Sequence, residues 1–400
     1  MIRKYGIFIS MILVFLAMAG VTHLKNGDWS FLTPENLSNL SQQITQTGIL
    51  AIGMTLVILI GGIDLSVGSI LAVSGITLAF AAEQFVPAGS LAPYLALLAA
   101  ILAGTILGAV NGGLIAGFGM IPFVVTLGML TIARGIAYLI TGSQSIRTKD
   151  PLFRTIGVES IDSMLYRWLG AGGDGAAGGA ARFPWFTVTL FVLIFCVWIA
   201  LRIHSVRKVK RYGMQSAPFG ESLFQIAAAA AGLLFCGWVF ASHQGLPVMV
   251  LLLGVIAVLA SFMLNRTTFG RHLYAIGGNK HAAHLSGIRV ERCTFIVFAL
   301  MGFLAAVSGI VSTCRAQGAA PATQGVLAEL EAIAAAVVGG TSLMGGVGTI
   351  GGTLIGALII GIVVNGMSIM ALPNPIQLVF KGLIIVIAVL IDIKTKSRKK

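Results

Sequence analysis

The segment NRTTFGRHLYAIGGNKHAAHLSGIRVER, residues 265–292, is the longest clearly polar stretch in the second half of an otherwise apolar chain. Within it, Asn279 and Gly287 enclose enough residues for two helical turns. Asn is a preferred N-cap residue because its side-chain oxygen accepts a hydrogen bond from a backbone N–H of the first turn. Gly often ends a helix in the left-handed conformation. The sequence therefore predicts a short helix with both ends capped.

One face of this short helix carries only small side chains. Ala282, Ala283 and Ser286 share that face, because residues three and four apart are neighbours on a helix. A helix of two turns is too short to persist alone in water, so some contact must hold it. Two interpretations stay open: the small face fits the groove of a partner protein, or the segment is an ordinary loop between membrane helices.

Composition places the chain among membrane proteins. It is 57% hydrophobic and 10% charged, with a mean hydropathy of +0.97, whereas a soluble domain carries about 25% charged residues. Repeated apolar runs of about 20 residues match a bilayer core about 30 Å thick. The four cysteines show no C-x-x-C or histidine spacing, so neither a metal site nor a disulfide framework is indicated. We expect an all-α polytopic membrane protein.

About twelve membrane spans are predicted. The first follows the basic tip of the chain, and Ala17-Met18-Ala19 could serve as a signal-peptidase site, although a multispan protein needs no separate signal and an uncleaved first helix is favoured. The others are 44–60, 69–85, 92–118, 123–141, 185–203, 223–241, 248–264, 295–312, 332–343, 350–370 and 378–391. The span 332–343 is short, and the sequence leaves open whether it crosses fully or forms a half-helix.

Basic residues set the expected orientation. With both termini in the cytoplasm, 17 of the 26 Lys and Arg residues fall on the inner side. The loop 142–184, with its flexible Gly/Ala-rich tract 170–181, is then periplasmic, whereas the loop 265–292 and the basic tail 394–400 are cytoplasmic. The net charge of +13 follows from this rule and from attraction to anionic lipid, so it does not indicate nucleic-acid binding. One transmembrane domain spans 1–400.

Polar residues inside the apolar segments are the candidates for a translocation path, because each is costly in a membrane. The run GGIDLSVGS, 61–69, interrupts one apolar segment, and Gly339-Gly340-Thr341-Ser342-Leu343 is similar to Gly61-Gly62-Ile63-Asp64-Leu65. Paired glycine interruptions often flank a transporter's central site, although chance similarity also explains so short a match. The candidates either line the path or make buried contacts that fix the fold. They are Asp64, Ser66, Arg134, Thr341, Ser342 and Asn365.

Motifs of catalysis and nucleotide binding do not occur in the sequence. It has no G-x-x-x-x-G-K-[ST], no H-E-x-x-H and no G-x-S-x-G. His281 and His284 lie three residues apart without a third ligand nearby, which is typical of surface histidines rather than of a zinc site. We therefore predict no catalytic residue, no metal site and no cofactor bound by this chain.

Four linked motifs resemble those of a known family. They are GR-x-x-YAIGGN-x-x-AA-x-LSGI at 270–288, GGIDLSVGS at 61–69, ARG at 133–135 and EAIAAAVVGGTSLMGGVGT at 331–349. Together they resemble the permeases of bacterial ABC importers for monosaccharides, the ribose/xylose/multiple-sugar group, and the similarity runs nearly from end to end. The additional pair of spans within 185–241 resembles the longer, xylose-type members.

The resemblance implies an importer-permease fold with broken helices in the bacterial inner membrane, working as a homodimer with a periplasmic sugar-binding protein and a cytoplasmic subunit that binds ATP. It also implies transport of a monosaccharide, xylose or a related sugar. Ala282-Ala283 and Gly287 match the coupling-loop pattern EAA-x-x-x-G, with His281 in place of Glu. The implied contacts with the ATP-binding subunit are made by Gly277, Gly278, Asn279, Ala282, Ala283 and Gly287.

Three other functions remain to be weighed against this one. A proton- or cation-coupled secondary sugar transporter needs a titratable carboxylate deep in the bundle, and Asp64 is the best one available. An integral-membrane enzyme needs clustered His, Asp or Glu near one face, which the sequence does not show. A passive channel conducts without ATP or a binding protein.

Overall fold

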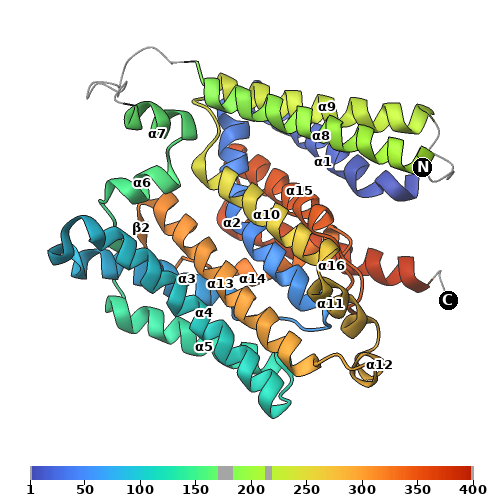
Figure 1. Cartoon of the computed structure of the whole chain (residues 1–400). Coiled ribbons are helices and arrows are strands. Elements are labelled where there is room, and N and C mark those ends of the chain that lie inside the picture. The colour runs from blue at the N-terminus through green and yellow to red at the C-terminus, as the bar shows by residue number, and fades with distance from the viewer. Residues whose placement is uncertain (1, 170–182, 212–218, 398–400) are drawn as a thin grey trace. The chain divides into compact units, whose positions relative to one another are not determined.

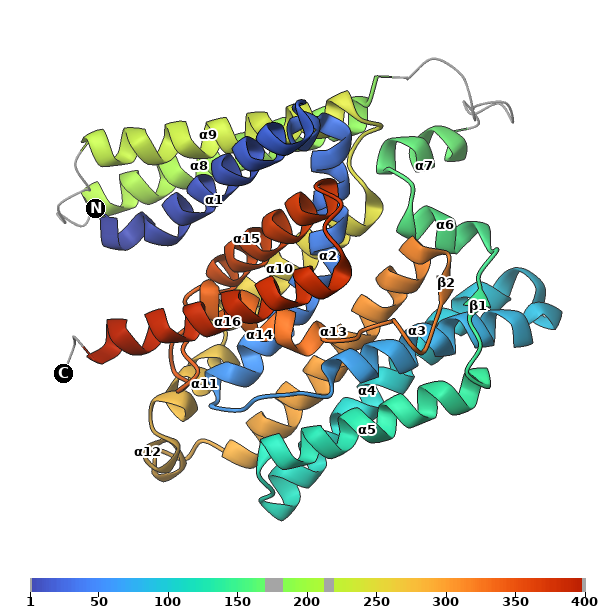
Figure 2. The same cartoon turned by 180° about the vertical axis from the view of Figure 1, so that it is seen from behind.

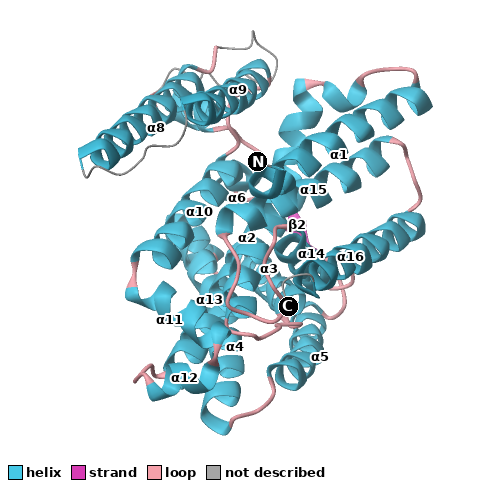
Figure 3. Cartoon of the chain, turned by 90° about the vertical axis from the view of Figure 1, so that its right-hand side faces the viewer, coloured by secondary structure: helices cyan, strands magenta, loops and turns pink. Residues whose placement is uncertain are grey.

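The computed structural model describes residues 2–169, 183–211 and 219–397, and these are almost entirely helical (Figure 3). Their contacts divide the chain into two compact units, which are described separately. The first unit contains 1–32, 40–158 and 249–400, and the second contains 33–39 and 159–248. The Gly/Ala-rich tract 170–181 lies outside the described residues.

The first unit is a helical bundle with one short strand pair. Ile146–Arg147 (β1) pairs antiparallel with Gly318–Ala319 (β2), as Figure 2 shows. Helices α2 and α10 belong in part to the second unit. The helices of the first unit are α1 Ile2–Asn26, η1 Ser30–Leu32, α2 Pro34–Leu59, α3 Val67–Gln84, η2 Val86–Leu91, α4 Ala92–Phe118, α5 Pro122–Thr141, α6 Pro151–Gly157, α10 Val248–Arg266, α11 Thr268–Gly278, α12 Lys280–Leu285, α13 Val290–Ala316, α14 Ala328–Val338, α15 Ile350–Ile369 and α16 Asn374–Ser397.

Among the described residues of the second unit there are three further helices: α7 Ile161–Trp168, α8 Trp185–Arg211 and α9 Phe219–Ser242. A buried carboxylate joins its segments. Asp162 accepts hydrogen bonds from the backbone N–H of Phe186 at 2.9 Å and from the hydroxyl of Thr187, which itself accepts from the N–H of Leu246 at 2.8 Å. The predicted spans 185–203 and 223–241 are helical, but their apolar stretches, Trp185–Ala200 and Ala229–Ser242, are shorter than a full span.

Helix α13 is at the centre of the first unit, packed against α3 and α4 (Figure 1). Glycines allow this close packing. A Cβ added at Gly108 of α4 would meet the carbonyl oxygen of Phe298 at 2.5 Å and the Cα of Gly302 at 2.6 Å. Gly104 and Gly112 also face α13. In a lipid environment small residues let helix backbones approach closely, as they do between α4 and α13.

Eight helices among the described residues are long and apolar enough to cross a membrane: Gly6–Asn26, Pro34–Leu59, Val67–Gln84, Gly89–Phe118, Pro122–Thr141, Val248–Arg266, Val290–Ala316 and Ile350–Ile369. Shorter apolar stretches occur in α8 and α9. The predicted span 332–343 needs correction. Helix α14 has 11 residues and ends at Val338, so it covers about 16 Å, half of an apolar core about 30 Å thick. It is a half-helix.

Replacing Gly108 with Val should destabilise the bundle by about 1–3 kcal/mol, because the new side chain is forced into the backbone of α13. Gly113→Val on the same helix is the matched control, since a Cβ at Gly113 meets nothing within 4 Å. Thermal unfolding in detergent gives the melting temperature of each purified variant. Equal melting temperatures for the two variants would contradict the packing role of Gly108.

Candidate coupling and translocation sites

The short helix α12 is capped as the sequence predicts. The Asn279 side-chain oxygen accepts from the N–H of Ala282 at 3.0 Å. Gly287 has a φ of +82° and donates its N–H to the carbonyl of His284 at 3.0 Å. A left-handed glycine at this position ends the helix and satisfies a carbonyl that would otherwise lack a partner.

The predicted small face of α12 is divided between two environments. Ala283 is buried against the chain's own core, whereas Ala282 and Ser286 are exposed. The large neighbour Leu285 is 74% exposed. One inward side chain is what holds so short a helix to the protein. Ala282, Leu285 and Ser286 are thus open to a partner in this structure and Ala283 is not, while the predicted contact residues stay a prediction.

Three backbone segments meet at the end of α11. Leu59, the last residue of α2, accepts a hydrogen bond on its carbonyl from the N–H of Gly346 at 2.9 Å. Gly277 lies against both partners, because a Cβ at this glycine would collide with the Leu59 carbonyl and the Gly346 nitrogen. A Cβ at Gly345 would lie 3.1 Å from the Gly277 carbonyl and from the N–H of Gly61. We call Leu59, Gly61, Gly277, Gly345 and Gly346 the glycine junction.

Tyr274 of α11 strengthens this contact. Its hydroxyl donates to the carbonyl of Gly348 at 2.8 Å, and burial raises the pKa of the phenol, so that it stays protonated as a donor. The loop 339–349 that precedes α15 is therefore attached to α11 by a side chain as well as by close backbone packing.

The two glycine interruptions have the same backbone geometry, but their predicted alignment was wrong by one residue. Gly61 has a φ of +77° and Gly340 has a φ of +89°. Each donates to the carbonyl three residues before it, and the following residues, Gly62 and Thr341, each donate to the carbonyl five residues back. This is the Schellman arrangement at a helix end. Gly61 thus corresponds to Gly340 and not to Gly339.

Asp64 and Ser66 form a buried cluster with Asn111 of α4. One Asp64 oxygen accepts from the N–H of Ser66 at 2.9 Å and from its hydroxyl at 2.6 Å, and the Asn111 amide donates to that hydroxyl at 2.9 Å. All three residues are fully buried. The cluster attaches the extended α2–α3 connection, visible in Figure 2, to α4. This geometry favours a fold-fixing role over path lining.

The other predicted path residues lie apart from this cluster. Arg134 of α5 donates to the carbonyls of Pro321 at 3.0 Å and Gln324 at 2.8 Å, and so holds the loop 320–327 before α14. Thr341 and Ser342 belong to the turn beside the glycine junction. Asn365 is buried in α15. The six predicted residues do not converge on one site, so their role in a path stays a prediction.

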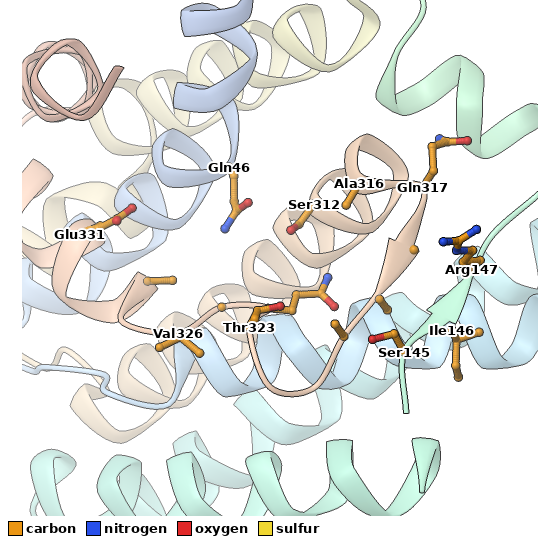
Figure 4. Close-up of a pocket in the computed structure, with 16 residues that line it drawn as sticks. Gln46, Ser145, Ile146, Arg147, Ser312, Ala316, Gln317, Thr323, Val326 and Glu331 are labelled. Carbon is orange, nitrogen blue, oxygen red and sulfur yellow. The ribbon is translucent and has the colours of Figure 1, made fainter. Parts of the chain in front are cut away.

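A polar cavity of about 480 Å³ lies elsewhere in the first unit. Figure 4 shows side chains from α2, α13, the strand pair and the α14 loop around it. Its lining is Gln46, Ser145, Ile146, Arg147, Ser312, Ala316, Gln317, Gly318, Ala319, Ala320, Thr323, Gln324, Gly325, Val326, Ala328 and Glu331. None of the six predicted path residues lines it.

Glu331 is held on both carboxylate oxygens. Lys381 of α16 pairs with one oxygen at 2.6 Å, and the hydroxyl of Thr47 of α2 donates to the other at 3.2 Å. Because Glu331 lies in the first turn of α14, these contacts attach the half-helix to α16 and α2. The carboxylate in the cavity wall is therefore already neutralised by this chain.

Ser66→Ala should lower stability by about 1–3 kcal/mol, because it removes hydroxyl bonds to Asp64 and Asn111 and leaves buried polar groups unpaired. Ser74→Ala is the matched control, since the Ser74 hydroxyl is buried without a hydrogen-bond partner among the described residues. Chemical unfolding of the two variants in detergent compares them. A Ser66 variant as stable as the Ser74 variant would show that the hydrogen bonds of the Ser66 hydroxyl do not contribute to stability as proposed.

Comparison with known proteins gives concordant matches. A family model described as "Branched-chain amino acid transport system / permease component" matches residues 36–202 and 180–389. The xylose transport system permease protein XylH of Escherichia coli (strain K12) is 36% identical over 371 residues, 93% of this chain and 88% of that protein. XylH of Haemophilus influenzae is 35% identical over 394 residues, 98% of this chain and 97% of that protein.

The ribose import permease protein RbsC of Escherichia coli (strain K12) is 34% identical over 365 residues, 91% of this chain and 88% of that protein. No solved structure matches the chain. The family model and these relatives cover most of the chain, and the helical bundle has the membrane-spanning helices that such a protein needs. The chain therefore belongs to this family of transport-system permease components, as a permease of the ribose/xylose type that its motifs predicted.

Proposed function

We propose that this chain is the membrane-spanning subunit of an ATP-driven importer, and that it carries a monosaccharide, xylose or a related sugar, across the bacterial inner membrane. The similarity to xylose and ribose permeases over nearly the whole chain supports the substrate class. The chain carries no P-loop, so ATP would be hydrolysed by a separate cytoplasmic subunit. A periplasmic sugar-binding protein and a second copy of the permease complete the proposed assembly.

The observation that carries the mechanism is the glycine junction. We call α11 and α12 the coupling segment. At the junction α11 is in direct backbone contact with the end of α2 and with the loop before α15. Interiors packed this closely transmit displacement instead of absorbing it. A movement of α11 and α12 imposed by the ATP-binding subunit would therefore shift the end of α2 and this loop with them.

The same helices continue to the polar cavity. Gln46 lies 13 residues before Leu59 on α2, about 20 Å along the helix axis. Glu331 lies on α14, whose end leads into the loop of the glycine junction. Two walls of the cavity are thus joined to the coupling segment through single elements. This arrangement fits alternating access, in which the motor subunit moves the walls around a sugar.

A proton-coupled carrier is the weaker alternative. It needs a titratable carboxylate that the path can reach, and Asp64 is fully buried and does not line the cavity. The carboxylate that does line it, Glu331, is paired with Lys381. A membrane enzyme and a passive channel have no support from the site geometry either.

Gly277→Ala should reduce the stimulation of ATP hydrolysis by sugar-loaded binding protein by about ten-fold or more, because one added methyl group meets the backbone of both neighbouring segments. Gly278→Ala is the matched control: a Cβ there meets nothing within 4 Å. The measurement is ATPase stimulation by sugar-loaded binding protein in the assembled complex, with assembly checked by co-purification. If the Gly277 variant assembles and is stimulated like the Gly278 variant, the junction does not transmit the movement.

The proposed energy source has its own test. We expect proteoliposomes that contain the permease, its ATP-binding subunit and its binding protein to accumulate D-xylose or D-ribose. Accumulation should require ATP on the side of the membrane that holds the ATP-binding subunit. A protonophore should leave the initial rate unchanged. Accumulation that follows an imposed proton gradient without the ATP-binding subunit would refute the importer proposal in favour of a secondary transporter.

A further inference from the structure

We propose that the polar cavity is a sugar-binding site of the permease itself, in which the side-chain carbonyl of Gln324 accepts a hydrogen bond from a sugar hydroxyl. The identity of the ligand as a monosaccharide rests on the proposed function. With this site the permease itself would contribute to substrate selectivity, in addition to the selectivity of the binding protein.

The amide of Gln324 carries the proposal. Its side chain is 8% exposed, and its nitrogen donates to the hydroxyl of Thr313 at 2.7 Å. The carbonyl of Gly309, at 3.5 Å, adds a second acceptor on the same side, which fixes the amide nitrogen there. The amide oxygen is buried, lacks a hydrogen-bond partner among the described residues, and belongs to a residue that lines the cavity.

An unpaired buried acceptor is costly, at about 1–3 kcal/mol. A ligand that donates a hydrogen bond to the Gln324 oxygen recovers that cost, and sugar hydroxyls are such donors. Arg134 is a positioning residue here, because its guanidinium holds the backbone carbonyl of Gln324 at 2.8 Å and that of Pro321 at 3.0 Å. The loop that presents Gln324 is therefore held in place from behind.

The remaining lining suits a neutral polyhydroxyl compound. Gln46, Ser312 and Thr323 turn toward the same space in Figure 4, and amides and hydroxyls both donate and accept. Glu331 has both oxygens engaged within the chain, so it offers no free charge. The volume of about 480 Å³ falls within the range of about 300–1,000 Å³ that is usual for small-molecule sites.

A branched-chain amino acid fits this lining less well. Its ammonium group needs a free carboxylate, and Glu331 is already paired with Lys381. The apolar part of the lining, which includes Ile146 and Val326, can receive its side chain but offers no partner for the ammonium group. A neutral sugar has no ammonium group to pair, so the sugar is the ligand that we propose.

The test compares Gln324→Met with Gln43→Met. Both variants replace an amide by a thioether, but only Gln324 lines the cavity. In proteoliposomes with the complete importer, we expect uptake of D-xylose or D-ribose to fall about 3–10-fold for Gln324→Met, as for the loss of one neutral hydrogen bond. Uptake by Gln43→Met should stay within about two-fold of the wild type, since Gln43 does not line the cavity.

A direct binding measurement accompanies the uptake assay. Saturation-transfer NMR of D-xylose, D-ribose and L-leucine with the purified permease in nanodiscs, without the binding protein, should give a sugar signal for the wild type and for Gln43→Met. The signal should be lost in Gln324→Met. If Gln324→Met does not fold, Gln46→Leu replaces it, with Gln43→Leu on the same helix as the control because Gln43 does not line the cavity.

The outcomes separate this inference from the proposed function. ATP-dependent sugar uptake that is equal in both members of a variant pair would overturn the cavity site and leave the importer function standing. A wild-type protein that imports no sugar with ATP would overturn the proposed function itself. An NMR signal from L-leucine without one from either sugar would also overturn the cavity proposal.

Discussion

The missing side chain at Gly277 is the constraint on which the first unit's proposed mechanism depends. Because nothing projects from this residue, the carbonyl of Leu59 and the N–H of Gly346 can pair with each other directly beside it. That bond gives a partner to a carbonyl at the end of α2, where the helix itself supplies none. The same contact joins α11 to two interrupted membrane segments, so the need for a backbone partner and the proposed coupling are met by one arrangement.

A half-helix in a membrane creates polar groups that must find partners inside the protein, because lipid offers none. The loop before α14 shows how this chain meets that demand. Arg134 satisfies two of its carbonyls, and Glu331 is satisfied by Lys381 and Thr47. The polar residues that look costly in the sequence are thus largely the partners of broken backbone, and the cavity forms where this irregular backbone leaves room.

Sequence patterns were sufficient for features that depend on neighbours in the chain. The caps at Asn279 and Gly287 follow from local preferences, and the structure has them. Of the about twelve spans that the apolar runs predicted, eight correspond to described helices that are long and apolar enough to cross a membrane. Helix α2 begins at Pro34, ten residues before the predicted span, because an N-terminal extension that is polar can still be helical. The glycine repeats were misaligned by one residue, since the hydrogen-bond register and not the letters defines equivalence.

The cavity could not be predicted because its polar residues come from segments far apart in the chain. Gln46 and Gln324 are unremarkable in their local sequence, and neither belongs to a charged or glycine-rich motif that marks a membrane site. What distinguishes Gln324 among the residues that line the cavity is a buried oxygen without a partner in the described part of the chain, and pairing is a property of three-dimensional packing. Neutral hydrogen bonds hold a ligand less strongly than charge-assisted ones, so the amides and hydroxyls in the lining of the proposed site can select a ligand and still release it.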